Sequence, residues 1–417
     1  MKLLLINPNR YHHPPVIPLS LEYIAGELLN SNHDCQVLDL CFSGHPEKDI
    51  EKSVSSYKPD LVGFTIRQID TVLYQNNEFF MDEIAGYIKL CKNLDLTVVL
   101  GGAGFSIMPL QTLHYTGADY GITGPGEKAI IKLLDNIEKN NDSPAILNGY
   151  DYFTNNFYRF TREIITDYQK YITHGGIVGF RTQIGCNSHC IFCTEANKKI
   201  IFHLPQSVGK EIARLKNLGF DHFHLCDSEF NLYLKHSIAV CQSIVEEAGP
   251  VNWALYMKPS PFSEELFYWI KQSGANLITL SMNTRDFNNS YKSRINDFIH
   301  LANRQEIKIA IDLSTGFPYE KIEKLEKTID FLTDQPVETV GVNAFYRVYP
   351  GTGLYNMVMN DNLLHSKLIN YNDENNFIHP VFFNHFTEEL VRDIINGKTK
   401  FRVEGFEKET NYQRVKG

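Results

Sequence analysis

The 417-residue sequence contains no apolar run of eighteen or more residues, which excludes a hydrophobic membrane-spanning helix. In its first residues, MKLLLINPNRY, the apolar run is too short for a signal segment, and a small-residue cleavage site is lacking. The formal net charge of −9 argues against a dedicated nucleic-acid binder, because such proteins usually carry a basic field. We therefore expect a cytoplasmic enzyme that acts on neither nucleic acid nor membrane.

Nucleotide-binding fingerprints are also missing. The sequence has no G-x-x-x-x-G-K-[ST] run, and GGAG at 101–104 is not in the register of a G-x-G-x-x-G motif. There are no internal repeats or low-complexity tracts. Eight cysteines are few for this length, and they are not spaced as a disulfide framework. Scattered ones are expected to be small core residues, so the three that cluster need a separate explanation.

The periodicity of the chain predicts α/β architecture in two parts. In residues 1–142, strand-like runs at 3–7, 35–40, 61–65, 96–102 and 118–124 alternate with helix-like segments, which is typical of a Rossmann-like parallel sheet. Residues 143–175, rich in aromatic residues and Asn, break this rhythm and are predicted to be a linker.

A second alternation occupies residues 176–350. Strands are expected at 176–185, 222–227, 251–257, 276–282, 307–314 and 339–348, and helices at 206–218, 233–247, 263–273, 289–304 and 321–334. Six such units predict a partial (β/α)6 barrel whose functional residues follow the carboxyl ends of the strands. Residues 351–417 are predicted to form a small C-terminal region.

Three cysteines, Cys186, Cys190 and Cys193, form C-x3-C-x2-C directly after the first expected barrel strand. A structural zinc site wants four ligands, and His189, between two of the cysteines, is a poor fourth. A fully ligated iron–sulfur cluster also wants four cysteines. Three thiolates on a [4Fe–4S] cluster would leave one iron open for a substrate or cofactor.

This motif, followed by six βα units, resembles that of radical S-adenosylmethionine enzymes. The resemblance implies a [4Fe–4S] cluster on the three cysteines and S-adenosylmethionine chelated to the fourth iron, where one-electron cleavage of the sulfonium yields a 5′-deoxyadenosyl radical. LCDSEFN (225–231), STGFPYE (314–320) and RVYPGTGLY (347–355) resemble further landmarks, although Tyr319 replaces a usual glycine and Asn283 a usual acid. The implied cofactor contacts are Asp227, Ser228, Glu229, Arg285, Ser314 and Gly316.

The first part resembles the cobalamin-binding domain that precedes the barrel in one class of these enzymes. The resemblance rests on residues 7–28, DLVGFTIR (60–67), GGAGFSIMP (101–109) and DYGITGPGEKAI (119–130). It implies cobalamin contacts at Gly101, Gly102, Gly104, Phe105, Ser106, Gly124, Gly126 and Glu127. No D-x-H-x-x-G run supplies a histidine beneath the cobalt. We expect Arg67 there, with an ion pair elsewhere as the alternative.

The expected function is methyl transfer from methylcobalamin to an unreactive carbon of a small molecule or peptide, with Tyr256, Lys258 and Arg347 as candidate catalytic residues. An electron donor such as flavodoxin or ferredoxin would be the protein partner. Two alternatives stay open: a radical cyclase, rearrangement or oxidation enzyme without methylation, and a non-catalytic cobalamin or iron–sulfur sensor. Product mass separates the first alternative, and absence of S-adenosylmethionine cleavage the second.

Overall fold

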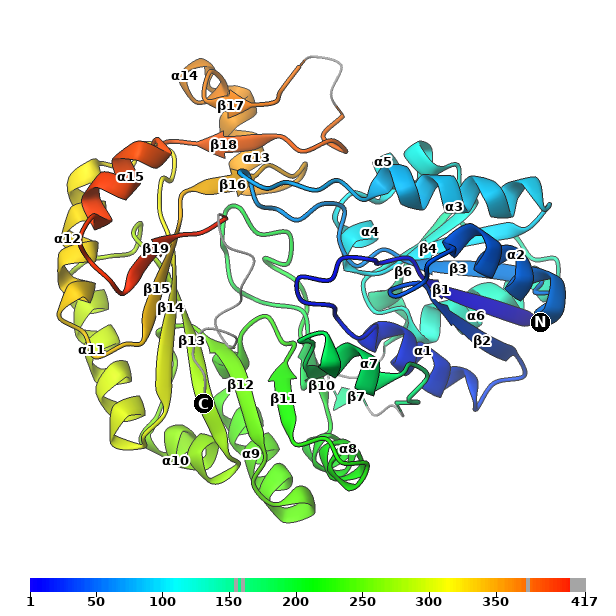
Figure 1. Ribbon diagram of the computed structural model, residues 1–417, viewed down its shortest axis with the longest axis horizontal. Helices are drawn as coiled ribbons and strands as arrows, with labels where there is room; N and C mark the ends of the chain where they lie inside the picture. Colours follow the sequence, from blue (N-terminus) through cyan, green and yellow to red (C-terminus); the bar gives the residue numbers. More distant parts are fainter. Residues whose placement is uncertain (154–156, 159–161, 373–375, 406–417) are drawn as a thin grey trace. The chain divides into compact units, whose positions relative to one another are not determined.

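The computed structural model describes residues 1–153, 157–158, 162–372 and 376–405, and the chain divides into two compact units (Figure 1). The first unit comprises Met1–Thr71, Asn77–Gly176 and Asp373–Pro380; the second comprises Val72–Asn76, Ile177–Asn372 and Val381–Gly417. Among the described residues, no helix combines the length and apolar character that a membrane span requires.

The first unit is built on a six-stranded parallel sheet of order β2-β1-β3-β4-β5-β6. The strands are β1 Lys2–Asn7, β2 Asp34–Asp39, β3 Leu61–Thr65, β4 Thr97–Gly101, β5 Tyr120–Thr123 and β6 Ile146–Asn148. The helices are α1 Leu19–Leu28, α2 Pro46–Tyr57, α3 Met81–Asn93, α4 Ala103–Ile107, α5 Pro109–Thr116, α6 Glu127–Glu138 and α7 Tyr168–Thr173, with a 3-10 turn η1 at Gly149–Tyr152.

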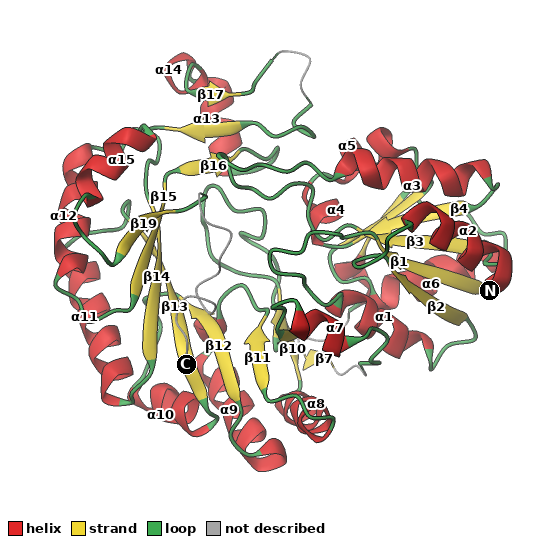
Figure 2. Cartoon of the chain, viewed as in Figure 1, coloured by secondary structure: helices red, strands yellow, loops and turns green. Residues whose placement is uncertain are grey.

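Burial on both faces explains why the strands of this sheet read as unbroken apolar runs. Every residue of β3 is buried, as expected for a central strand with helices on both sides (Figure 2). One face packs against α1 and α6, whose Leu21, Leu28, Ile130 and Leu133 join the strand side chains in one core. The buried apolar residues of α6, namely Ala129, Ile130, Leu133 and Leu134, recur at helical spacing and join this core.

The second unit contains a seven-stranded parallel sheet of order β19-β15-β14-β13-β12-β11-β8. Its strands are β8 Val178–Phe180, β11 His222–Leu225, β12 Asn252–Met257, β13 Ala275–Asn283, β14 Lys308–Ser314, β15 Thr339–Asn343 and β19 Phe401–Val403. Helices lie along the outer side of the curved sheet (Figure 2): α8 Pro205–Asn217, α9 Leu234–Ala248, α10 Glu264–Gln272, α11 Asn289–Arg304 and α12 Ile322–Thr333.

Smaller elements complete the second unit. They are β9 Gln183–Ile184 paired antiparallel with β10 Ile201–His203, a 3-10 turn η2 at Phe230–Leu232, an antiparallel sheet of β16 Phe345–Arg347, β18 Phe382–Asn384 and β17 Leu368–Ile369, and helices α13 Gly353–Asn360, α14 Asn362–His365 and α15 Glu388–Ile395.

Two of the predicted boundaries differ from the structure. The segment predicted as a linker, 143–175, contributes β6, η1 and α7 to the first unit. The predicted C-terminal region, 351–417, is largely part of the second unit, because β19 pairs with β15 and lengthens the barrel-like sheet. Part of each segment lies outside the described residues.

Candidate active site

The three clustered cysteines lie on one loop of the second unit, immediately after β9. Gly185 begins this loop with φ +86, a conformation that favours glycine. The loop is held by its own backbone: the Cys193 amide donates to the Cys190 carbonyl at 3.1 Å, and the Lys198 amide donates to the Cys186 carbonyl at 2.8 Å. None of the three forms a disulfide.

The three thiols are close enough to affect one another's ionisation. Burial, followed by charge repulsion from Cys193, Cys186 and Glu229, raises the pKa of Cys190 to about 11, whereas Lys258 opposes the shift. The pKa of the Cys193 thiol is also raised, mainly by burial, and Cys186 contributes to this shift. Metal coordination offsets the cost of ionising these thiols, because the metal ion replaces their protons and neutralises the thiolate charge. A three-thiol donor set of this kind fits an iron–sulfur cluster.

Phe192 fixes the loop against the body of the second unit. Its ring centroid lies 5.0 Å from that of Tyr346 and 6.0 Å from that of Phe317. The neighbouring Ile191 carbonyl accepts from the Leu354 amide at 2.8 Å. The loop is therefore seated on the segments that follow β14 and β15, and the PGTG turn at 350–353 packs against it.

Asp227, predicted to contact S-adenosylmethionine, instead anchors the strand that leads to the cysteines. Its Oδ1 accepts from the amides of Thr182 at 2.8 Å and Gln183 at 3.2 Å, and its Oδ2 accepts from the Thr182 hydroxyl at 2.5 Å. The carboxylate is only 7% exposed, and burial raises its pKa to about 6. Both carboxylate oxygens thus accept hydrogen bonds from the protein, and through them Asp227 fixes residues 182–183, which lead into the cysteine loop.

Glu229, the second acid of this motif, lies near enough to the cysteine loop for its charge to affect Cys190. Burial raises the pKa of its carboxyl to about 8, while the Ser281 hydroxyl and Lys258 favour the charged form. Its Oε2 is buried and has no hydrogen-bond partner among the described residues, and its charge is felt by Cys190. Buried polar oxygens without a partner are uncommon in folded proteins, and contact between Glu229 and S-adenosylmethionine stays a prediction. Ser228, next to it, is exposed.

The segment STGFPYE forms a tight turn after β14. Gly316 has φ +78, and its amide and that of Phe317 donate to Glu320 Oε2 at 2.8 and 2.9 Å. Tyr319 stands where the family resemblance predicts glycine, and it also adopts a positive φ of +61. The backbone conformation that favours glycine at this position is therefore kept, although the residue is tyrosine. Ser314 ends β14, and the hydroxyl of the buried Tyr346 donates to the carbonyl of the next residue, Thr315, at 2.7 Å.

Arg285 lies on an exposed loop after β13. Asn283, at the end of that strand, bonds within the loop: its Nδ2 donates to Asp286 Oδ2 at 3.0 Å, and its Oδ1 accepts from the Asp286 amide at 2.8 Å. The side chain that replaces the expected acid is therefore used to shape the loop, and contact between Arg285 and a cofactor stays a prediction.

The three candidate catalytic residues occupy different environments. Tyr256 lies half-buried on β12, with its ring 5.9 Å from that of His224. Lys258 follows the same strand and donates to Ser188 Oγ, in the cysteine loop, at 2.8 Å. Arg347 is 5% exposed, donates to the Val348 carbonyl and lies over the Tyr349 ring. The buried side chain of Arg347 is held by its own neighbours, and its contact with substrate stays a prediction.

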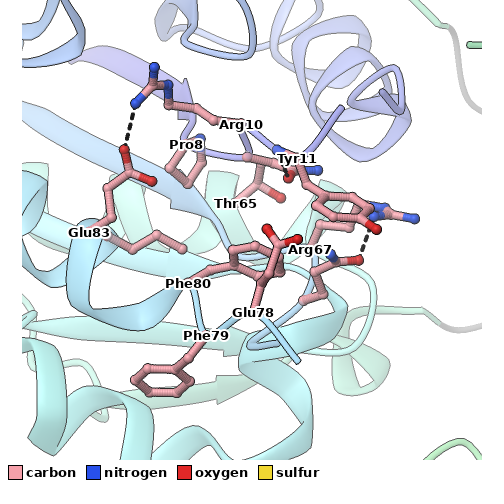
Figure 3. A pocket seen from close by; sticks show the side chains of 12 residues that line it. Pro8, Arg10, Tyr11, Thr65, Arg67, Glu78, Phe79, Phe80 and Glu83 are labelled. Carbon is pink, nitrogen blue, oxygen red and sulfur yellow. Dashed lines mark hydrogen bonds and ion pairs between the residues drawn. The ribbon is translucent and has the colours of Figure 1, made fainter. Parts of the chain in front are cut away.

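In the first unit, a cavity of about 380 Å³ opens where the strand order changes direction, between β1 and β3. Ligands of open α/β sheets bind at such switch points. Figure 3 shows the lining, which includes Arg10 and Arg67; Arg10 pairs with Glu83 at 2.7 Å, and Arg67 donates to Gln68 at 2.5 Å. Arg67 is exposed.

The predicted glycines of the first unit divide into two groups. A Cβ at Gly101 would meet only the Ile122 carbonyl at 3.9 Å, so the end of β4 leaves open space for a ligand. A Cβ at Gly102 would lie 2.5 Å from the Ile66 carbonyl, and one at Gly104 would lie 2.9 Å from Gln68. Those two glycines are required for close packing of the β3 and β4 loops, which is a different role from the predicted one.

The remaining predicted cobalamin residues are mainly structural. Phe105 is fully buried against Gly121 and cannot reach a ligand, which corrects that prediction. Ser106 Oγ donates to the Gly102 carbonyl and accepts from the Gly124 amide at 3.0 Å, so it joins the β4 and β5 loops. A Cβ at Gly124 would meet the Tyr150 ring at 2.6 Å, and one at Gly126 would touch Ile24. Glu127, at the start of α6, is buried.

His236 supports the same strand as Asp227, and sequence reasoning did not single it out. Its Nε2 donates to the Thr182 carbonyl at 3.1 Å, the side chain is 9% exposed, and burial lowers its pKa to about 4. In the unfolded chain the His236 imidazole becomes protonated below about pH 6.5. In the folded protein it becomes protonated only near pH 4. Stability is therefore lost as the pH falls through this window.

We predict that His236→Gln, which keeps a donor but cannot titrate, makes stability less sensitive to acid. From pH 7.5 to pH 5, the wild type should lose about 2 kcal/mol more unfolding free energy than the variant. Urea unfolding at the two pH values measures this, and His222→Gln, at an exposed histidine, is the matched control. Equal acid sensitivity of H236Q and wild type would contradict the assignment.

The amino-acid sequence is similar to one protein family and to two methyltransferases. Residues 11–134 match the B12 binding domain family. The chain is 25% identical to a tryptophan 2-C-methyltransferase of Streptomyces laurentii, covering 84% of this chain and 73% of the relative. It is 24% identical to an uncharacterized methyltransferase of Pyrococcus horikoshii, covering 91% of this chain and 86% of that one.

Solved structures share the fold. TsrM from Kitasatospora setae, a radical S-adenosylmethionine methyltransferase solved with tryptophan and a S-adenosylmethionine analog bound, aligns with a TM-score of 0.85 and 21% identity over 99% of this chain and 93% of that one. The same enzyme has been solved with cobalamin and a [4Fe–4S] cluster. The predicted fold class is confirmed, because the chain shares its fold with TsrM. The predicted resemblance of the first unit is confirmed by the match of residues 11–134 to the B12 binding domain family.

Proposed function

We propose that the protein is a cobalamin-dependent radical S-adenosylmethionine enzyme that transfers a methyl group to an unreactive carbon of a small molecule. The observation that carries this proposal is the three-thiol loop at the carboxyl end of a parallel barrel-like sheet, in a chain whose other unit matches the B12 binding domain family. When bound, the cluster, S-adenosylmethionine and cobalamin supply the electron, the methyl group and its carrier.

In this proposal the second unit binds the cluster and S-adenosylmethionine. Cys186, Cys190 and Cys193 hold the cluster, and Glu229 offers its unpartnered buried oxygen to the cofactor's amino group. Ser228, Arg285, Ser314 and the Gly316 turn complete the cofactor contacts at the same edge of the sheet. Parallel strands bring these residues together because their carboxyl ends meet at one edge.

The first unit would hold cobalamin at the cavity between β1 and β3. Gly101 leaves room for the ligand at the end of β4, and we place Arg67, at the cavity lining, beneath the corrin. A guanidinium stays protonated and does not coordinate cobalt. The lower face would then lack a protein ligand, which favours release of a methyl group.

Replacing Arg67 by histidine is expected to introduce a nitrogen ligand. The absorption maximum of bound cobalamin should move, and each cobalt line in the electron paramagnetic resonance spectrum of the one-electron-reduced form should split into a triplet from one nitrogen. Arg10→His, elsewhere in the same cavity, is the control and should leave both spectra unchanged. Spectra of R67H identical to those of wild type would remove Arg67 from the lower face.

Tyr256, on the half-buried side of β12, is the proposed proton donor or acceptor toward substrate, and tryptophan is the first acceptor to test because a relative methylates it. A flavodoxin or ferredoxin is the proposed electron donor. Protein reconstituted without oxygen with iron, sulfide and hydroxocobalamin is supplied with S-adenosylmethionine, tryptophan and a reductant. It should then produce S-adenosylhomocysteine and an acceptor heavier by one CH2. Turnover of S-adenosylmethionine with no gain of mass in any acceptor would favour a radical reaction without methylation.

A further inference from the structure

Lys258 lies beside the cysteine loop instead of in an open substrate space. It is the first residue after β12, and its Nζ donates to Ser188 Oγ at 2.8 Å. Ser188 lies between Cys186 and Cys190 in the sequence. The lysine thus contacts the loop midway between the first two thiols.

The backbone of Lys258 is fixed by a buried amide. Asn231, which is 0% exposed, accepts from the Lys258 amide at 3.1 Å and donates to the Lys258 carbonyl at 2.8 Å and the Pro261 carbonyl at 2.7 Å. Because both the amide and the carbonyl of Lys258 bond to the Asn231 side chain, the backbone of Lys258 has little conformational freedom. Asn231 and Asp227 belong to the same motif, so LCDSEFN holds the cysteine loop from two directions.

The charge of Lys258 faces the anionic groups of the site. Its ammonium favours the ionised form of the buried Glu229 carboxyl. The hydrogen bond to Ser188 places the same nitrogen atom directly beside the loop that carries the three thiols. A cation at this position stabilises whichever state of the site carries more negative charge.

We propose that Lys258 is a positioning residue of the cluster: through Ser188 it orders the cysteine loop, and its charge raises the reduction potential of the cluster. This inference rests on the proposed function only in requiring a cluster on the three cysteines. Reduction adds one electron, supplied by dithionite in the test, and makes the cluster and its thiolates more negative. A fixed ammonium nearby therefore stabilises the reduced form.

The test compares reconstituted Lys258→Met, Lys258→Arg and wild type by redox titration followed with electron paramagnetic resonance. K258M should show a lower cluster potential and release iron to a chelator about 10-fold faster, as loss of an outer contact to a metal site typically does. K258R, which keeps charge and donor, should restore the potential. Lys271→Met, at a lysine paired with Glu306 on the outer side of the sheet, should behave as wild type.

If circular dichroism shows that K258M is not folded, a second variant tests the role of Lys258 instead. Ser188→Ala removes the hydrogen bond and keeps the charge, so it should speed iron release with a smaller change in potential. Wild-type iron retention and potential in K258M, or in S188A if K258M does not fold, would overturn the inference. Failure of the wild type itself to form a [4Fe–4S] cluster would instead overturn the proposed function.

Discussion

Cys186→Ala is expected to eliminate both cluster binding and methyl transfer. With three thiolates the cluster already uses every cysteine of the loop, so losing one leaves two irons without protein ligands. Cys186 is 6% exposed and packs with Ile200, Phe202 and Leu232, which makes it the anchored end of the loop. Cys190→Ala and Cys193→Ala should have the same effect.

Iron content, the visible absorption of the cluster and turnover measure this prediction together. Iron should fall to background in each variant, and product should become undetectable. Cys241→Ala, at a fully buried cysteine of α9, is the matched control and should retain its cluster. A Cys186→Ala protein with full iron content and wild-type turnover would contradict the role assigned to the loop.

Arg162→Met should cost the first unit about 3–5 kcal/mol of unfolding free energy, since it leaves a buried carboxylate without its cation. Arg162 Nε lies 2.6 Å from Glu22 Oε2, and both side chains are almost completely buried. Tyr168 donates to the same carboxylate oxygen at 2.5 Å. The pair joins α1 to the segment predicted to be a linker, so this segment is an integral part of the unit.

Urea unfolding, with hydrogen exchange of α1 peptides to localise the effect, measures the loss. Lys92→Met is the control in the same unit, because Lys92 and Asp119 form a partly exposed pair at 2.7 Å whose contribution should be below about 1 kcal/mol. The double variant Arg162→Met/Glu22→Leu should recover much of the loss by removing the orphaned charge. Equal stability of R162M and K92M would contradict this assignment.

The regular elements were predictable because their apolar periodicity is strong. Helices expected at 206–218 and 289–304 are found at Pro205–Asn217 and Asn289–Arg304, and the strand expected at 61–65 is β3. The strand expected at 339–348 is divided at Ala344, where the chain leaves the parallel sheet as β15 and enters an antiparallel one as β16. Apolar character continues across the division, so composition could not reveal it.

Side-chain roles were less predictable than elements. Asp227 and Glu229 are both acids in one motif, yet only the structure shows that three donors from 182–183 occupy Asp227 while Glu229 Oε2 is left unpartnered among the described residues. Asn231 and His236 carry no signal of their own, because their partners lie far away in the sequence. Long-range pairing of this kind cannot be read from local pattern.

The central claim is that one chain holds both a cluster and cobalamin for methyl transfer. Its most direct test is to reconstitute the full chain without oxygen, remove unbound metal, and measure iron and cobalt. The same sample is then supplied with S-adenosylmethionine, tryptophan and a reductant, and S-adenosylhomocysteine is measured. We predict iron and cobalt in a ratio of about 4 to 1 and S-adenosylhomocysteine that forms only when both metals are present. Zinc in place of iron on the cysteine loop, or a protein that retains no cobalt, would contradict the account.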